Sequence, residues 1–215
     1  MTGRVLLAGA TGLVGSALLR QLLADPAGPE VVAFGRRAPP IQSPRLRFQA
    51  TDFATLEAQA PIAADAAYCA LGTTIHSAGS PAAFAAVDLD AVVAFARYAR
   101  RCGATHFMLV SALGADPASR VFYSRIKGEA EKAVAAAGFD AVHIAQPSFL
   151  LGDRAESRPG KWIGKHIAHL LRPLLLGPLR PYRAVPAVEV AAALIVAAAS
   201  AARGVLRQRF GGTPT

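Results

Sequence analysis

The sequence predicts a doubly wound α/β domain, in which helices cover both faces of a parallel sheet. Three observations predict this fold. Short apolar runs alternate with segments of helical periodicity, no hairpin turn joins neighbouring runs, and 53% of the 215 residues are hydrophobic while 17% are charged. Strands that are joined through helices run parallel, and strands covered on both faces are apolar throughout. A chain of this length forms one sizeable core, so we expect a single domain over residues 1–215.

The predicted elements alternate between strand and helix in chain order. The apolar run "RVLLAGA" (4–10) predicts a buried strand, and "LVGSALLRQLLA" (13–24) predicts the helix after it. A later helix contains Tyr123 and Lys127, and Gly138 is expected to cap it. The other predicted elements are strands at 30–35, 46–50, 66–71, 106–112 and 140–146, the last stopped by Pro147, and a helix over about 81–101.

The pattern changes after residue 147. Residues 148–184 contain prolines, glycines and a leucine cluster, "HLLRPLLLGPL", in place of strand–helix alternation. We expect a C-terminal substrate-covering excursion there. The stretch "AVPAVEVAAALIVAAASAA" (184–202) is the most hydrophobic, but it includes Pro186 and Glu189 and is rich in alanine. It therefore predicts a buried helix and not a membrane span.

Charge and cysteine content exclude several classes of function. The net charge is +9, but the arginines are scattered along the chain without interleaved aromatic residues, which argues against nucleic-acid binding. Cys69 and Cys102 are too few for a disulfide framework, and His166 and His169 lack a carboxylate or cysteine pattern that would complete a metal site. The first apolar run has no basic leader or cleavage site. We therefore expect no metal and a cytoplasmic protein.

The motif "GATGLVG" (9–15) directly follows the first predicted strand and opens the first predicted helix. Gly9 would permit a tight turn, Gly12 a close approach of the backbone to a pyrophosphate, and Gly15 close packing of helix on sheet. The phosphates would bind at the amides and dipole of the helix start. The alternative is that these small residues only pack a helix on a strand. The predicted cofactor-binding residues of this loop are Gly9, Thr11, Gly12, Leu13, Val14 and Gly15.

The next predicted strand ends in "GRR" (35–37). An NAD-selective enzyme would place an acidic residue there, on the ribose 2′-hydroxyl. Gly35 is instead followed by Arg36 and Arg37, whose planar guanidinium groups suit a 2′-phosphate. The alternative is two solvated arginines. The sequence favours NADP(H) over NAD(H).

A serine, a tyrosine and a lysine follow in an order that indicates proton transfer. Ser111 ends the strand "HFMLVS", Tyr123 lies twelve residues on, and Lys127 lies one helical turn beyond it. An adjacent ammonium favours the phenolate and brings the pKa of the tyrosine closer to working pH. Ser111 would hydrogen-bond a substrate carbonyl and hold it against the phenol. We therefore predict these three as the catalytic residues.

In this arrangement the chain resembles the short-chain dehydrogenase/reductase superfamily, whose serine, Tyr-x-x-x-Lys pair and glycine-rich loop it matches. More narrowly, it is similar to the atypical, Tat-interacting-protein-like branch, which includes an NADPH-binding regulator. The narrower similarity rests on "GATGLVG", "GRR", "LGTT", "SALGAD", "YSRIKGEAE" and "GDRAESRPGKW". The resemblance implies a Rossmann-type fold.

Several roles follow from this resemblance. It implies that Asp52 lies at the adenine, and that Tyr123 and Lys127 also hold the cofactor. Many relatives have an asparagine on the middle helix, where this chain has Asp88 in "VDLD", which puts the usual proton relay in doubt. The loop at the nicotinamide ribose would contain Leu71, Gly72 and Thr73, and the turn that meets the carboxamide would contain Pro147 and Ser148.

The expected function is an NADPH-dependent oxidoreductase that reduces a small carbonyl- or quinone-type substrate by hydride transfer. One alternative is a non-enzymatic NADPH-binding protein that regulates or senses redox state, and another is an isomerase or epimerase that retains its cofactor. We expect neither nucleic acid nor membrane as a partner, and a homodimer or a protein partner stays open. His76, just past the predicted nicotinamide loop, is expected to be an exposed histidine or to line the substrate entrance.

Overall fold

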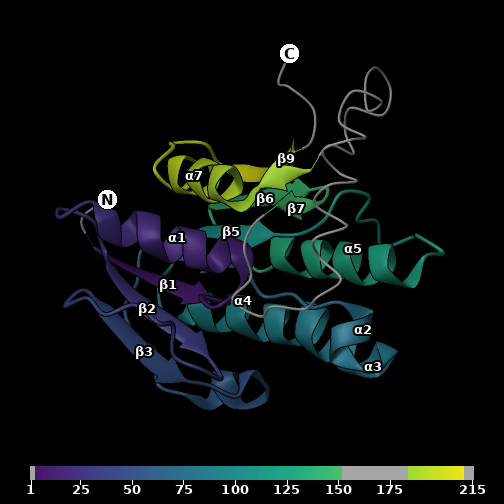
Figure 1. The fold of residues 1–215 in the computed structure, drawn as a ribbon, viewed down its shortest axis with the longest axis horizontal. Helices are drawn as coiled ribbons and strands as arrows, with labels where there is room; N and C mark the ends of the chain where they lie inside the picture. The colour runs from purple at the N-terminus through teal and green to yellow at the C-terminus, as the bar shows by residue number, and fades with distance from the viewer. Residues whose placement is uncertain (1–2, 152–183, 211–215) are drawn as a thin grey trace.

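A computed structural model describes residues 3–151 and 184–210. Seven strands form one sheet in the order β3-β2-β1-β4-β5-β6-β9, and all neighbouring strands are parallel (Figure 1). The strands are β1 (Arg4–Ala8), β2 (Glu30–Gly35), β3 (Leu46–Ala50), β4 (Ala66–Cys69), β5 (His106–Val110), β6 (Ala141–Pro147) and β9 (Gly204–Phe210). Two short strands, β7 (Leu150–Leu151) and β8 (Val185–Pro186), pair separately.

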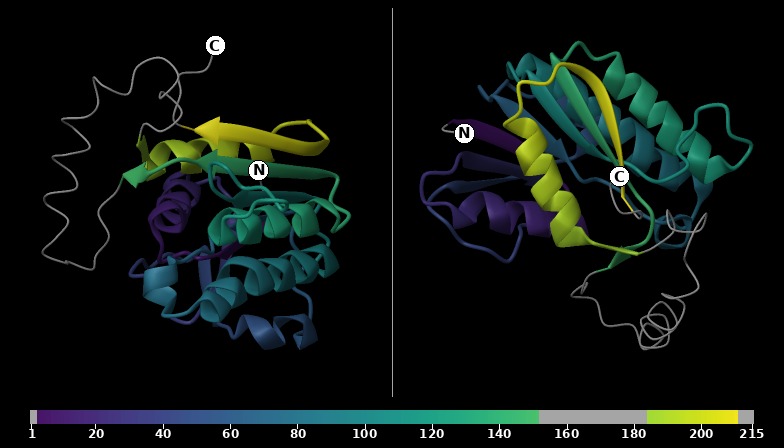
Figure 2. Two further views of the ribbon diagram at one scale, coloured as in Figure 1. Left: turned by 90° about the vertical axis from the view of Figure 1, so that its right-hand side faces the viewer. Right: turned by 90° about the horizontal axis from the view of Figure 1, so that it is seen from above.

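Helices cover both faces of the sheet. On one face lie α1 and α7, which pack side by side, and on the other lie α4 and α5 (Figures 1 and 2). The α-helices are α1 (Leu13–Ala24), α2 (Ile75–Ala78), α3 (Pro81–Ala85), α4 (Ala91–Arg101), α5 (Phe122–Ala135) and α7 (Ala187–Ala198). A 3₁₀ helix, η1 (Phe53–Ala58), and a π-helical turn, η2 (Ala86–Asp90), complete the described helical elements.

Successive residues of each central strand enter opposite halves of the core. In β1, Leu7 packs with α1 and α7, whereas its neighbour Leu6 packs with α4, and both are fully buried. This alternation follows from the pleat of a strand, and burial on both faces explains why the strand sequences are apolar without a polar alternate. The predicted doubly wound parallel fold is confirmed.

The order of the strands identifies the edge of the sheet at which a crevice for a ligand is expected. From β1 the chain adds β2 and β3 on one side, then crosses to the other side for β4, so β1 and β4 are the strands at which the winding reverses. In a parallel sheet all carboxyl ends lie at the same edge, and ligands bind where the winding reverses. The segments that follow β1, β2, β4, β5 and β6 therefore meet at this edge.

Some element predictions hold and others are wrong. The predicted bounds of the helix at 13–24 and the strands at 30–35 and 46–50 match α1, β2 and β3. The single helix predicted over 81–101 is instead α3, the π-helical turn and α4, and the seventh strand, β9, was not predicted. The hydrophobic stretch 184–202 contains α7, and no described helix is long and apolar enough to cross a membrane. Most of the predicted excursion at 148–184 lies outside the described residues.

Candidate active site

The glycine-rich loop connects β1 to α1 at the crevice. Gly9 has a φ of +85°, and a Cβ atom there would lie 2.4 Å from the Ala70 carbonyl oxygen. Only glycine combines this left-handed backbone with so close an approach of two chain segments. The Gly12 N–H donates to the Gly9 carbonyl oxygen (2.9 Å), which closes the turn that leads into the helix.

The first turn of α1 depends on the absence of a side chain at Gly15. A Cβ atom at Gly15 would lie 2.0 Å from the Gly9 carbonyl oxygen, and one at Gly12 would lie 3.3 Å from the same atom. Gly12 is the N-cap residue of α1 and supplies no side-chain hydrogen bond to the helix start. The backbone N–H groups of the first turn are therefore left for an anionic group, as a dinucleotide pyrophosphate requires. The loop fits the cofactor that its sequence predicts.

The ends of β2 and β3 form one side of the crevice. The Thr51 N–H donates to the Gly35 carbonyl oxygen (2.9 Å), which holds Asp52 close to the end of β2. The Asp52 carboxylate accepts from the Ala54 N–H (3.0 Å) and so caps η1. Arg36 and Arg37 are exposed, and neither makes a hydrogen bond or ion pair with another residue of the described ranges.

The centre of the candidate site is a buried ion pair. Lys127 on α5 lies with its Nζ 2.6 Å from Asp88 Oδ1, and the two side chains are 7% and 0% exposed. The second carboxylate oxygen, Oδ2, accepts from the Thr73 N–H (2.8 Å). Apart from the ammonium, Oδ1 has no hydrogen-bond partner among the described residues. The structure thus joins the predicted lysine and nicotinamide loop through an aspartate.

Tyr123 lies one turn before Lys127 and is partly buried. Its ring packs against the fully buried Phe84 ring, with centroids 5.5 Å apart. Burial raises the pKa of the Tyr123 phenol, the Lys127 ammonium lowers it, and the Asp88 carboxylate raises it again, so that the pKa lies above its usual value. The sequence-based expectation was a lowered pKa, and it did not include the charge of Asp88. Tyr123 therefore holds its proton at neutral pH.

Ser111 follows β5 at the same edge of the sheet. Its hydroxyl group is buried and has no hydrogen-bond partner among the described residues. A buried hydroxyl without a partner costs free energy unless a ligand or water supplies the missing bond. The backbone around it is held firmly, since the Ser111 N–H donates to Ala145 (2.8 Å) and the Leu113 N–H donates to Pro147 (2.9 Å). The Ser148 N–H donates to Phe210 (3.2 Å) on the edge strand β9.

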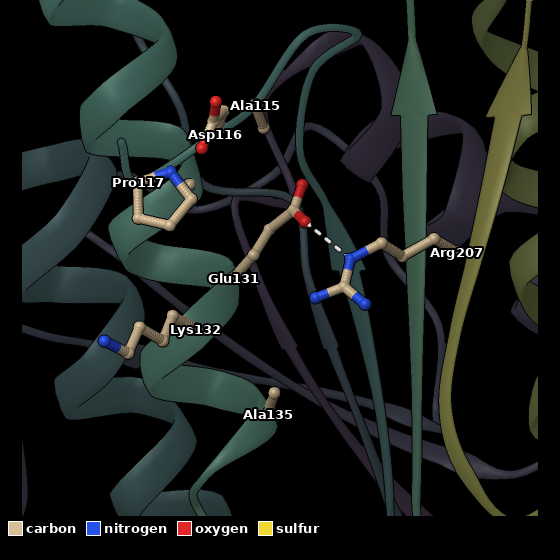
Figure 3. A pocket seen from close by; sticks show the side chains of 8 residues that line it. Ala115, Asp116, Pro117, Glu131, Lys132, Ala135 and Arg207 are labelled. Carbon is tan, nitrogen blue, oxygen red and sulfur yellow. Dashed lines mark hydrogen bonds and ion pairs between the residues drawn. The ribbon is translucent and has the colours of Figure 1, made fainter. Parts of the chain in front are cut away.

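Sequence reasoning missed a second polar group on α5. Glu131, one turn beyond Lys127, is buried and accepts from Gln146 Nε2 (2.9 Å) and Arg207 Nε (3.0 Å). This carboxylate joins α5 to β6 and β9 and borders a pocket of about 330 Å³ (Figure 3). Its position one helical turn from Lys127 was the sequence signal that could have identified it. The pocket is lined by Ala115, Asp116, Pro117, Gly128, Glu131, Lys132, Ala135 and Arg207.

The remaining candidates have separate outcomes. His76 is exposed on the short helix α2. Within residues 3–151 and 184–210, no group of three or more His, Cys, Asp or Glu side chains could hold a metal ion. His166 and His169 lie outside the described residues. The residues predicted for the loops after β1, β2, β4, β5 and β6 lie at or after the carboxyl ends of their strands, as a shared site requires.

Comparison with known proteins relates the chain to a family. A family described as NAD(P)H-binding matches residues 9–162. Protein HTATIP2 of Rattus norvegicus is 36% identical over 166 residues, which are 75% of this chain and 68% of that protein. A protein from Coccidioides immitis, named mitochondrial protein FMP52, is 33% identical over 214 residues, with 91% of this chain and 85% of the relative covered.

Solved structures support the fold at lower sequence identity. The enzyme MoeE5, in complex with UDP-glucuronic acid and NAD, is 21% identical with a TM-score of 0.74, and the match covers 97% of this chain and 76% of that one. WbmH of Bordetella bronchiseptica, in complex with NAD+, is 15% identical with a TM-score of 0.70 and a coverage of 97% and 75%.

The fungal relatives correct one expectation. Several of them, including the protein of Emericella nidulans that is 34% identical over 176 residues, are named mitochondrial. The prediction of a cytoplasmic protein is therefore wrong. It rested on the missing secretory signal, and such a signal marks only one of several destinations outside the cytoplasm.

Proposed function

The chain belongs to the NAD(P)H-binding family of atypical short-chain dehydrogenases/reductases, and from this premise we propose that it is an NADPH-dependent oxidoreductase that reduces a small carbonyl- or quinone-type substrate. The observation that carries the proposal is the unpartnered, buried hydroxyl group of Ser111, which directly follows β5 at the carboxyl edge of the sheet. Lys127 of α5 approaches the same edge beside Gly72, which follows β4. A substrate oxygen would supply the hydrogen-bond partner that Ser111 lacks. The site then offers one donor to orient the substrate and another, Tyr123, to protonate it.

The roles of the residues follow from their chemistry. When bound, the reduced cofactor would supply a hydride to the carbonyl carbon and would itself become oxidised. Tyr123 donates its proton to the carbonyl oxygen, which yields the alcohol, and water returns a proton to the phenolate. Ser111 orients the carbonyl through its hydroxyl group, and Lys127 donates to the ribose hydroxyls of the cofactor with the N–H groups that Asp88 leaves free.

The preference for NADPH is proposed on the basis of Arg36 and Arg37. Both are exposed directly after β2 and have no partner within the described residues. A 2′-phosphate would give their guanidinium groups paired, charge-assisted hydrogen bonds. Replacing both by alanine should weaken NADPH binding at least tenfold while NADH binding changes little, measured by cofactor fluorescence. Equal losses for the two cofactors would contradict the assignment.

The proposed reaction is tested by following NADPH absorbance with aldehydes, ketones and quinones, for the wild-type protein and the Tyr123→Phe variant. General acid catalysis contributes about 10²–10⁴ in rate, so the variant should lose at least tenfold in turnover. Its affinity for NADPH should stay close to that of the wild type, because only the hydroxyl is removed. Turnover that does not depend on Tyr123 would remove the tyrosine from the mechanism.

A second candidate function is a non-enzymatic NADPH-binding regulator. It is favoured by Asp88, which is fully buried and ion-paired where many relatives have the asparagine of a proton relay. In this case Tyr123 and Lys127 would only hold the ribose. NADPH binding without oxidation by any member of the substrate panel would support this second function.

A further inference from the structure

Asp88, which pairs with Lys127, lies in a local departure from α-helical geometry. The segment between α3 and α4 winds as the π-helical turn η2, which contains Asp88. Single π-helical turns inside α-helical segments are rare overall, and those that occur are often found at functional sites. The turn directs the side chain of Asp88 into the protein, where the carboxylate is 0% exposed.

Gly72 lies directly beside the pair. A Cβ atom at Gly72 would be in ordinary contact with it, 3.4 Å from Asp88 Oδ1 and 3.5 Å from Lys127 Nζ. The Thr73 N–H fixes the other carboxylate oxygen. One ammonium and one carboxylate at 2.6 Å, both removed from water, form a unit without net charge.

Among the described residues, two charged groups act on the Tyr123 hydroxyl. Lys127 comes from the same helix and Asp88 from η2, while α3 contributes only the apolar ring of Phe84. The Cys69 thiol on β4 lies within the field of the pair, but burial raises its pKa to about 12, so it stays neutral. Burial of the phenol raises its pKa most, and the part that charged groups contribute depends on the balance between one cation and one anion.

We propose that Asp88 is a positioning residue that cancels the charge of Lys127 and so favours the protonated form of Tyr123, the form that donates the proton in carbonyl reduction. The catalytic part of this inference rests on the proposed function. Reduction needs the proton on Tyr123, as described above. Oxidation of an alcohol needs the phenolate to accept the hydroxyl proton while hydride leaves the carbon for the oxidised cofactor. The paired carboxylate disfavours the phenolate and so moves the pH range of alcohol oxidation to higher pH.

The test is a titration of Tyr123 in the protein without cofactor. Tyrosinate absorbance is measured against pH, and the curve of the matching Tyr123→Phe protein is subtracted to isolate this residue. In the Asp88→Asn variant the amide retains an oxygen for the Thr73 N–H, but the ammonium is no longer balanced. The midpoint of Tyr123 should fall by about one pH unit or more, the usual effect of an uncompensated neighbouring charge. An unchanged midpoint would overturn the proposal.

If the unpaired, buried ammonium of Lys127 prevents the Asp88→Asn protein from folding, a double variant provides the test. Asp88→Asn combined with Lys127→Gln replaces a neutral ion pair by a neutral pair of amides. The midpoint of Tyr123 should then stay close to the wild-type value. A shift as large as that predicted for the single variant would refute the charge balance. A residue with only a structural role would change stability without moving either midpoint.

Catalysis gives an independent readout. With a substrate pair in hand, the pH profile of kcat/KM for alcohol oxidation should move to lower pH by about one unit in Asp88→Asn, because the phenolate that accepts the proton then forms at lower pH. A profile that does not move would refute the catalytic part of the proposal. A shifted midpoint in a protein that oxidises no NADPH would support the charge balance and count against the proposed oxidoreductase, so the two failures are distinguishable.

Discussion

Replacement of Gly9 by alanine tests the geometry of the glycine-rich loop. Two costs are expected. The left-handed backbone at φ +85° costs a residue with a Cβ atom about 1–2 kcal/mol. The new methyl group would also lie 2.4 Å from the Ala70 carbonyl oxygen and 2.9 Å from the Leu71 nitrogen, and displacing packed backbone costs about 1–3 kcal/mol. We therefore expect Gly9→Ala to lower the free energy of unfolding by about 2–5 kcal/mol.

Gly79 offers a matched control. Its φ is +87°, but a Cβ atom there would meet no atom within 4 Å. Gly79→Ala should therefore carry only the backbone cost of about 1–2 kcal/mol. The difference between the two variants isolates the contact with the segment after β4. Urea denaturation followed by circular dichroism measures both free energies, and equal losses would refute the reasoning that the two segments are in close contact.

The same two variants separate packing from cofactor binding. If the loop after β1 holds a dinucleotide, Gly9→Ala should also weaken NADPH binding at least tenfold, because the loop must move away from Ala70. Gly79→Ala should leave NADPH affinity unchanged. Wild-type affinity in a destabilised Gly9→Ala protein would show that the loop does not bind the cofactor.

Two further predictions concern buried polar groups on the sheet face under α7. Burial and the neighbouring His106 lower the pKa of His143, so stability should fall as the pH drops from the usual histidine value near 6.5 through the lowered one, because the unfolded chain takes up the proton first. His143→Gln should flatten that part of the curve of unfolding free energy against pH, and an equally steep curve would exclude His143 as its source. The Tyr68 hydroxyl is buried without a hydrogen-bond partner among the described residues, and burial raises its pKa. Tyr68→Phe should therefore be neutral or stabilise by up to about 1 kcal/mol in urea denaturation, and a loss of more than about 1 kcal/mol would reveal a partner for the hydroxyl.

The fold could be predicted where local and global signals agree. The bounds of α1 follow from a glycine-rich turn at one end and an aspartate–proline pair at the other, and those of β2 from a short apolar run between a proline and two arginines. The strand β9 carries no such signal. Its sequence "GVLRQRF" is mostly exposed because it lies at the sheet edge and no helix of the described residues buries it on both faces, so its pairing with β6 depends on contacts distant in sequence.

The candidate site was predictable in its parts but not in its electrostatics. Tyr123, Lys127 and Ser111 are recognisable from their order and from the glycine-rich loop before them. The local sequence "AVDLD" around Asp88 is compatible with an ordinary helix, and nothing in it predicts the π-helical turn in which Asp88 is buried. The pairing of Asp88 with Lys127 depends on the approach of α5 to this segment. The pKa of Tyr123 is raised where the sequence predicted a lowered one, mainly because the phenol is buried, and the Asp88 carboxylate adds to this effect.

The Asp88–Lys127 pair is compatible with both candidate functions. A lysine ammonium has three N–H donors, and the carboxylate engages the group at one oxygen, so donors remain for ribose hydroxyls. Cofactor binding therefore survives the pairing in either function. Proton donation adds a requirement that binding does not have, namely a phenol that keeps its proton until the substrate oxygen needs it. A phenol of ordinary pKa near 10 already keeps its proton at neutral pH, so the raised pKa of Tyr123 is compatible with both functions. Turnover that depends on the Tyr123 hydroxyl is therefore the property that separates the reductase from the regulator.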